Sequence, residues 1–127
     1  MDTTFIIGSS ATACTGQNWN RILNFVKALV SHFGASPSGS HFALIPYSTD
    51  PELVLKFNSL TGSQLRVSEV NGRVAGLRCQ GGSNRIDKAL DLADKEVLTY
   101  PAGMRDVSRV KLYARTINFY YIKCSFY

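Results

Sequence analysis

The chain has 127 residues, of which 45% are hydrophobic and 18% charged, and these fractions are typical of one globular domain. They exclude a disordered chain. The net charge of +5 would favour contact with polyanions, but the basic residues are scattered with no run of five. We therefore expect a mildly basic surface and no nucleic-acid site. No segment has the uninterrupted apolar length that spans a bilayer.

The first half of the chain predicts a strand, a helix and a pair of strands. Residues 4–7 form a short apolar run, which predicts a buried strand that enters a loop rich in hydroxyls. The next helix has Asn18 as its expected N-cap and Gly34 as its expected end. Its apolar face consists of Trp19, Ile22, Leu23, Val26, Leu29, Val30 and Phe33. The apolar runs at 42–47 and 53–57 flank a turn, so we expect them to pair as a hairpin at one edge of the sheet.

The second half predicts two more helices. Apolar spacing predicts a helix that starts near Ser63, which Gly72 and Gly76 weaken. After the glycine-rich segment 81–84, a second amphipathic pattern predicts a helix over 86–93. Because parallel strands need helical crossovers, this alternation predicts an α/β fold, a Rossmann-like three-layer sandwich with a mostly parallel sheet.

Five short motifs occur in a particular order and spacing. They are Asp2-Thr3-Thr4-Phe5-Ile6-Ile7, Asn18-Trp19, Phe42-Ala43-Leu44-Ile45-Pro46-Tyr47-Ser48, Gly81-Gly82-Ser83-Asn84 and Gly103-Met104-Arg105-Asp106. Together they resemble the von Willebrand factor A (vWA) domain family. The resemblance implies an incomplete vWA-like domain over residues 1–110, followed over 111–127 by a possible fourth strand and a divergent tail. The last strands and helices of the family are then missing.

The resemblance also implies a degenerate metal-ion-dependent adhesion site. Ser10 and Thr12 match the two first-loop hydroxyls of the family, and Ser83 matches its second-loop threonine, whereas Gly8 replaces the first-loop aspartate. The third-loop acid has no counterpart, since no Asp or Glu follows Asp106. Magnesium prefers oxygen ligands that include carboxylates. We therefore expect no bound cofactor, and a divalent cation held by the three hydroxyls is the alternative.

The loops at the carboxyl edge of the sheet are the partner-binding surface that the resemblance implies. The candidate residues are Ser9, Ser10, Thr12, Gly82, Ser83 and Asn84. Cys14 and Cys79 fall at the same edge, where they can form a disulfide or remain two separate half-buried thiols. The chain has three cysteines, and the odd number leaves at least one thiol free or paired with another chain.

The function that the resemblance implies is binding. No catalytic arrangement of side chains is recognisable, so we expect no enzyme. A vWA-type module of protein interaction or adhesion would bind collagen or another matrix or cell-surface protein and would be extracellular, although no leader precedes the first strand. The alternatives are an intracellular vWA scaffold in a multiprotein assembly and a non-functional fragment of a larger vWA protein. A disulfide would favour the extracellular interpretation.

Overall fold

The structure, a computed structural model, describes residues 2–105, 111–116 and 119–124, with side chains up to Arg105. In chain order, its elements are β1 (Asp2–Gly8), α1 (Asn18–Phe33), β2 (His41–Tyr47), the 3-10 helix η1 (Gly62–Gln64), α2 (Val67–Ala75), α3 (Ile86–Leu92), the π-helical turn η2 (Ala93–Val97), the 3-10 helix η3 (Tyr100–Ala102), β3 (Lys111–Thr116) and β4 (Phe119–Cys124). The predicted boundary near residue 110 and the tail positions 117–118 and 125–127 lie outside the described residues. No helix in the described ranges is both long and apolar enough to cross a membrane.

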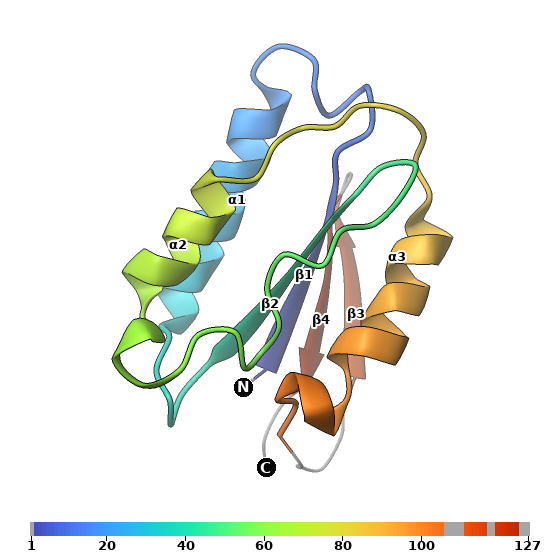
Figure 1. Cartoon of the computed structure of the whole chain (residues 1–127). Helices are drawn as coiled ribbons and strands as arrows, with labels where there is room; N and C mark the ends of the chain where they lie inside the picture. Colours follow the sequence, from blue (N-terminus) through green and yellow to red (C-terminus); the bar gives the residue numbers. More distant parts are fainter. Residues whose placement is uncertain (1, 106–110, 117–118, 125–127) are drawn as a thin grey trace.

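One sheet lies between two helical layers (Figure 1). α1 and α2 cover one face, and α3 with η2 covers the other. Side chains alternate along a strand, so Phe5 and Ile7 of β1 join the core beneath α1 and α2, while Ile6 joins the core beneath α3. The predicted α/β three-layer sandwich is confirmed.

β1 and β2 form the centre of the core. They are parallel and in register from Asp2 beside His41 to Gly8 beside Tyr47, so their carboxyl ends meet at one edge of the sheet. Phe5 stacks on Phe42 with ring centroids 5.7 Å apart, and both rings are buried. Every residue of β1 is buried, as expected for a strand that is covered on both faces.

The sheet is mixed, which corrects the prediction of a mostly parallel one. The strand order is β2-β1-β4-β3, with β4 antiparallel to β1 and β3 antiparallel to β4. Only two residues, 117 and 118, separate β3 from β4, and a connection that short permits an antiparallel hairpin but no crossover. The tail therefore contributes two strands where one was predicted, and β4 occupies the place beside β1.

The predicted edge hairpin is only partly formed. The segment after β2, residues 51–57, returns alongside β2 but forms no strand, and it pairs with β2 at isolated bridges. The described bridges are Leu44 with Leu55 and Tyr47 with Pro51. Pro46 lies between them on β2 and has no N–H to donate, so a continuous ladder cannot form there.

The helix ends differ from prediction by small amounts. Gln17 occupies the N-cap position of α1 in place of Asn18, and Gly34 ends the helix as predicted, with its N–H donating to the carbonyl of Val30 at 2.9 Å. The helix expected from Ser63 begins as η1, and its regular part, α2, starts at Val67. The third helix continues from α3 into η2.

Candidate functional site

Backbone hydrogen bonds join three loops at the carboxyl edge of β1 and β2. The N–H of Ser9 donates to the carbonyl of Tyr47 at 2.7 Å, and this bond connects the loop after β1 to the end of β2. Gly81 donates to the Ser9 carbonyl at 2.8 Å, and Ala11 donates to the Gly82 carbonyl at 3.2 Å. Two segments about seventy residues apart in sequence therefore form one surface.

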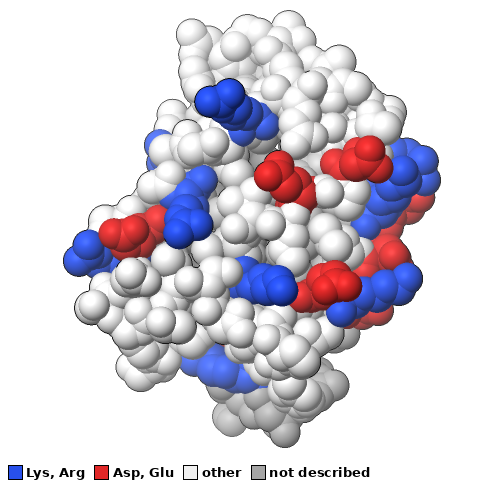
Figure 2. Space-filling model, viewed as in Figure 1, with Lys and Arg blue, Asp and Glu red and all other residues white. Residues whose placement is uncertain are grey.

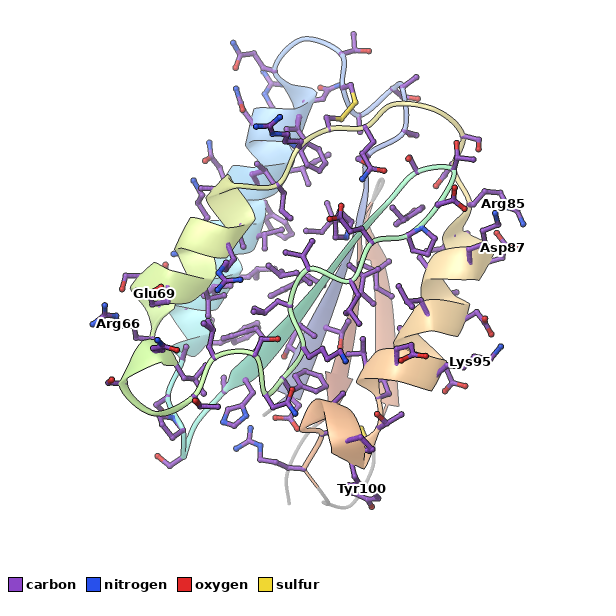
Figure 3. The ribbon with its side chains drawn as sticks, viewed as in Figure 1. Arg66, Glu69, Arg85, Asp87, Lys95 and Tyr100 are labelled. Atoms are coloured by element: carbon purple, nitrogen blue, oxygen red, sulfur yellow. A yellow bond between two sulfur atoms is a disulfide. The ribbon has the colours of Figure 1, made fainter. Side chains whose placement is uncertain are left out.

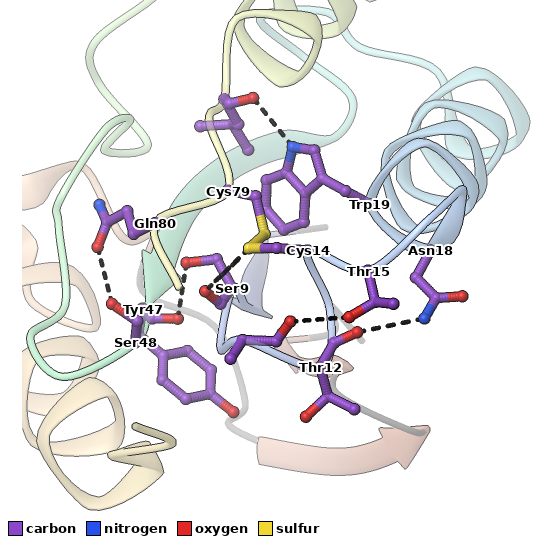
Figure 4. Close-up of a disulfide and its surroundings, with 12 residues drawn as sticks. Ser9, Thr12, Cys14, Thr15, Asn18, Trp19, Tyr47, Ser48, Cys79 and Gln80 are labelled. Carbon is purple, nitrogen blue, oxygen red and sulfur yellow. Dashed lines mark hydrogen bonds between the residues drawn. A yellow bond between two sulfur atoms is a disulfide. The ribbon is translucent and has the colours of Figure 1, made fainter. Parts of the chain in front are cut away.

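A disulfide between Cys14 and Cys79 joins the same two loops covalently (Figure 4). Their α-carbons are 5.6 Å apart, within the usual range for a disulfide. Trp19 of α1 lies beside the bond, and its indole Nε1 donates to the carbonyl of Leu77 at 3.2 Å. Of the two alternatives left open by the sequence, the structure contains the disulfide.

Thr49 is a site residue that the sequence analysis did not single out. Its Oγ1 accepts hydrogen bonds from the Ser83 N–H at 3.3 Å and from the Ser83 Oγ at 3.2 Å. Thr49 follows β2, the parallel neighbour of β1, and carboxyl ends of neighbouring parallel strands share an edge. The position of Thr49 just after β2 is therefore the signal in the sequence that could have identified it as a site residue.

Gly82 fits closely against Thr49. Its φ is +91°, a conformation that favours glycine, and an added Cβ would lie 2.7 Å from the Thr49 Oγ1. Glycine at this position therefore allows the second loop to approach the loop after β2.

The six candidate partner-binding residues differ in exposure. Ser9 is fully buried, and its Oγ donates to the Tyr47 carbonyl at 3.1 Å; Ser10 is 7% exposed. Four are exposed to solvent, namely Thr12, Gly82, Ser83 and Asn84. The carbonyl of Thr12 accepts a hydrogen bond from the Asn18 side chain at 3.2 Å. The exposed surface of the edge thus carries hydroxyl, amide and backbone groups, while Ser9 and Ser10 are buried and the Ser9 hydroxyl bonds to the end of β2.

The donors matched to the family's metal ligands do not fit a divalent cation. Ser10, Thr12 and Ser83 supply neutral hydroxyls, the Ser83 hydroxyl already bonds to Thr49, and Gly8 supplies no side chain. Magnesium sites in proteins use one or two carboxylates. Within residues 2–105, no group of three His, Cys, Asp or Glu side chains is placed to hold a metal.

The acids nearest in sequence to these loops are paired with cations. Lys88 Nζ lies 3.1 Å from the Asp50 carboxylate, and Arg85 donates to both oxygens of Asp87 at 3.0 and 2.8 Å (Figure 3). The hydrogen bond from Arg85 lowers the pKa of Asp87 to about 2, so this carboxylate stays ionised and paired at neutral pH. In the view of Figure 2, basic and acidic side chains are interspersed over the middle of the molecule, at the level of α2 and α3.

Comparison with known proteins identifies the family. The von Willebrand factor type A domain family matches residues 2–114 of the chain. The chain belongs to this family. Two solved structures of proximal thread matrix protein 1 from the mussel byssus are similar to it. The one with a zinc-occupied MIDAS motif is 20% identical with a TM-score of 0.68, covering 76% of this chain and 24% of that chain.

The second crystal form of the same mussel protein is also 20% identical, with a TM-score of 0.69, and the match covers 78% of this vWA chain and 25% of that chain. The vWA chain thus spans about a quarter of the length of these proteins. At such identities the likeness shows the fold. No curated protein sequence matches the chain.

Proposed function

We propose that this vWA domain is an extracellular binding module that contacts a protein ligand through the loops at its carboxyl edge and requires no divalent cation. The proposal rests on one observation, namely that the loops at the carboxyl edge of β1 and β2 are bonded to each other. A disulfide and two backbone hydrogen bonds hold the first and second loops together, and the exposed groups on them are neutral. Membership of a family of interaction and adhesion modules favours binding over catalysis.

The chemistry of the edge suits a protein surface. Hydroxyls, the Asn84 amide and exposed backbone groups can donate to and accept from the peptide groups of a partner. Because the loops are already fixed, little loop entropy is lost on binding. Collagen or another matrix or cell-surface protein is the partner class that we propose, and the likeness to a thread matrix protein supports it.

The disulfide supports an extracellular location. Disulfides persist in oxidising compartments, and the cytosol keeps most thiols reduced. Cys14 and Cys79 lie under the binding edge, so their oxidation would also fix the shape of that edge.

The test is binding of the chain to immobilised fibrillar collagen, in EDTA and in millimolar magnesium. We expect equal binding in both buffers and a loss of about tenfold for Asn84→Lys, since one interface residue can contribute that much. Asn24→Lys is the control. Asn24 is an exposed residue of α1, so this variant introduces the same change of side chain away from the carboxyl edge. Absence of binding would exclude collagen, a magnesium requirement would contradict the metal-free mechanism, and full binding by Asn84→Lys would contradict the site.

A further inference from the structure

A hollow of about 470 Å³ lies between the C-terminal half of α2 and the outer side of β2. Pro46, Glu52 and Val54 line one wall, and the α2 side contributes Arg73 and Arg78. The hollow lies between α2 and the segment after β2, which face the viewer in Figure 1. Its volume is within the range of known ligand sites, about 300–1,000 Å³. None of the six candidate edge residues lines it.

Two glycines leave the helical wall of the hollow without side chains. Gly72 lies within α2 and Gly76 at its end, and glycine inside a helix costs about 1 kcal/mol relative to alanine. A Cβ added at Gly72 would meet no atom within 4 Å, and one at Gly76 would make ordinary contacts at 3.6 Å. Neither glycine has a positive φ. Packing and backbone conformation therefore do not require glycine at either position, and the effect of both glycines is to keep the hollow open.

Arg73 and Arg78 bring positive charge to this hollow. Both are exposed, and neither pairs with a carboxylate within residues 2–105; the described salt bridges use other cations. Glu52 is the acid of the opposite wall, and its Oε2 accepts a hydrogen bond from Gln80 Nε2 at 3.3 Å. The net charge of the lining is therefore positive.

The walls are held in place before any ligand arrives. Gln80 also accepts a hydrogen bond from Ser48 Oγ at 3.0 Å, which fixes it against the end of β2. Arg78 precedes Cys79, whose disulfide anchors that segment to the first loop. The Val54 N–H donates to the carbonyl of Leu44 in β2 at 3.1 Å. A preorganised site loses less entropy on binding.

We propose that this hollow binds an acidic segment of a partner protein, with a carboxylate of that segment between Arg73 and Arg78. The planar guanidinium group matches a carboxylate through two parallel hydrogen bonds. Pro46, Val54 and Leu77 provide apolar surface for the aliphatic side chains that flank the acid. The Glu52 carboxylate repels a doubly charged anion such as phosphate more than a single carboxylate. None of the six candidate partner-binding residues lines this hollow, so the inference does not depend on the proposed function.

The test uses the full chain and a capped heptapeptide that carries two glutamates flanked by valines. We expect saturable shifts of the backbone amide NMR signals of residues 72–80, and no such shifts with the glutamine version of the peptide. Arg73→Glu and Arg78→Glu should each weaken binding about tenfold or more, because each removes a charge-assisted hydrogen bond. A peptide with lysines in place of the two glutamates should bind the chain that carries both Arg73→Glu and Arg78→Glu, because the charges of the two partners are then exchanged.

Two further variants separate binding from folding. Arg21→Glu makes the same charge change on the exposed surface of α1 and should bind as the unmodified chain does. Gly72→Leu fills the hollow while favouring the helix, so it should abolish binding without lowering the melting temperature. Several results would overturn the proposal: no shifts at millimolar peptide, equal binding of the glutamine peptide, unchanged binding by the Arg73 and Arg78 variants, or tighter binding of inorganic phosphate at the same amides.

Discussion

Arg105 donates hydrogen bonds to both oxygens of the buried Asp2 carboxylate and so joins the start of β1 to a segment 103 residues later. Its backbone N–H donates to Asp2 Oδ2 at 2.9 Å and its Nε to Oδ1 at 2.8 Å, and its guanidinium also donates to the carbonyl of Gly39 at 2.7 Å. Asp2 is fully buried, and the Arg105 side chain is 25% exposed. The pair therefore joins the chain at the amino end of β1, opposite the carboxyl edge that holds the candidate partner-binding residues.

Asp2→Asn should lower the free energy of unfolding by about 3 kcal/mol, because it leaves a mostly buried cation without its counter-charge. Urea denaturation measures this. Asp87→Asn is the control at an exposed pair and should leave stability nearly unchanged. A loss for Asp2→Asn as small as that of the control would show that the pair adds little to stability.

The layers of the fold could be predicted from the sequence, because buried apolar residues recur at the spacing of a helix or fill the run of a buried strand. Val26 and Val30 recur at helical spacing and are fully buried, and the apolar run of β1 is covered on both faces. The direction of β4 could not be predicted. The apolar pattern of a strand reports whether its faces are covered and not the direction in which it runs. The two-residue link makes β3 and β4 antiparallel to each other, but it does not decide which of them lies beside β1, and that choice sets the direction of the strand there.

The candidate site was predicted less completely. The position of Ser10 and Ser83 at one edge followed from the motifs, but their different exposure did not, since it depends on how the loops fold over one another. The bonds from Ser83 to Thr49 depend on tertiary contact between residues 34 positions apart, which no local pattern encodes. The same holds for the ion pair of Asp2 and Arg105.

Blocking free thiols in the denatured but unreduced chain and then measuring its mass should reveal one modified cysteine, Cys124, and an intact bond between Cys14 and Cys79. Replacing both bonded cysteines by alanine should lower the free energy of unfolding by about 4 kcal/mol. The physical reason is the closed loop of 65 residues, whose freedom in the unfolded chain the bond restricts. Modification of all three cysteines in the unreduced chain would exclude the disulfide.

Gly82→Ala should destabilise the edge more than Gly81→Ala. Both glycines have a positive φ, but an added Cβ would meet Thr49 Oγ1 only at Gly82, whereas at Gly81 it would meet nothing within 4 Å. We expect each substitution to lower the free energy of unfolding by about 1–2 kcal/mol through backbone strain. Gly82→Ala should lose more through the contact.

Thr49→Ala tests the origin of that extra loss. Combined with Gly82→Ala, it removes the atom that the new Cβ would meet, so the double variant should be more stable than the sum of the two single changes predicts. Denaturant unfolding of the four chains provides the measurement. Equal losses at Gly81 and Gly82, or strict additivity with Thr49→Ala, would show that the close approach has no energetic effect.

Magnesium, manganese and zinc at millimolar concentration should leave the melting temperature of the chain unchanged. Gly8 supplies no carboxylate, and the hydroxyl of Ser83 already bonds to Thr49, so dehydration of the cation would be poorly offset. A ligand present at a hundred times its dissociation constant adds about 2.7 kcal/mol to the stability of the state that it binds, which a thermal melt detects readily. Gly8→Asp alone should restore little, because one carboxylate joins three neutral hydroxyls and no second acid follows Asp106 in the sequence. Ser10→Ala is the matched variant: a metal-dependent rise in melting temperature that disappears with this substitution would place a cation at the edge and overturn the metal-free mechanism.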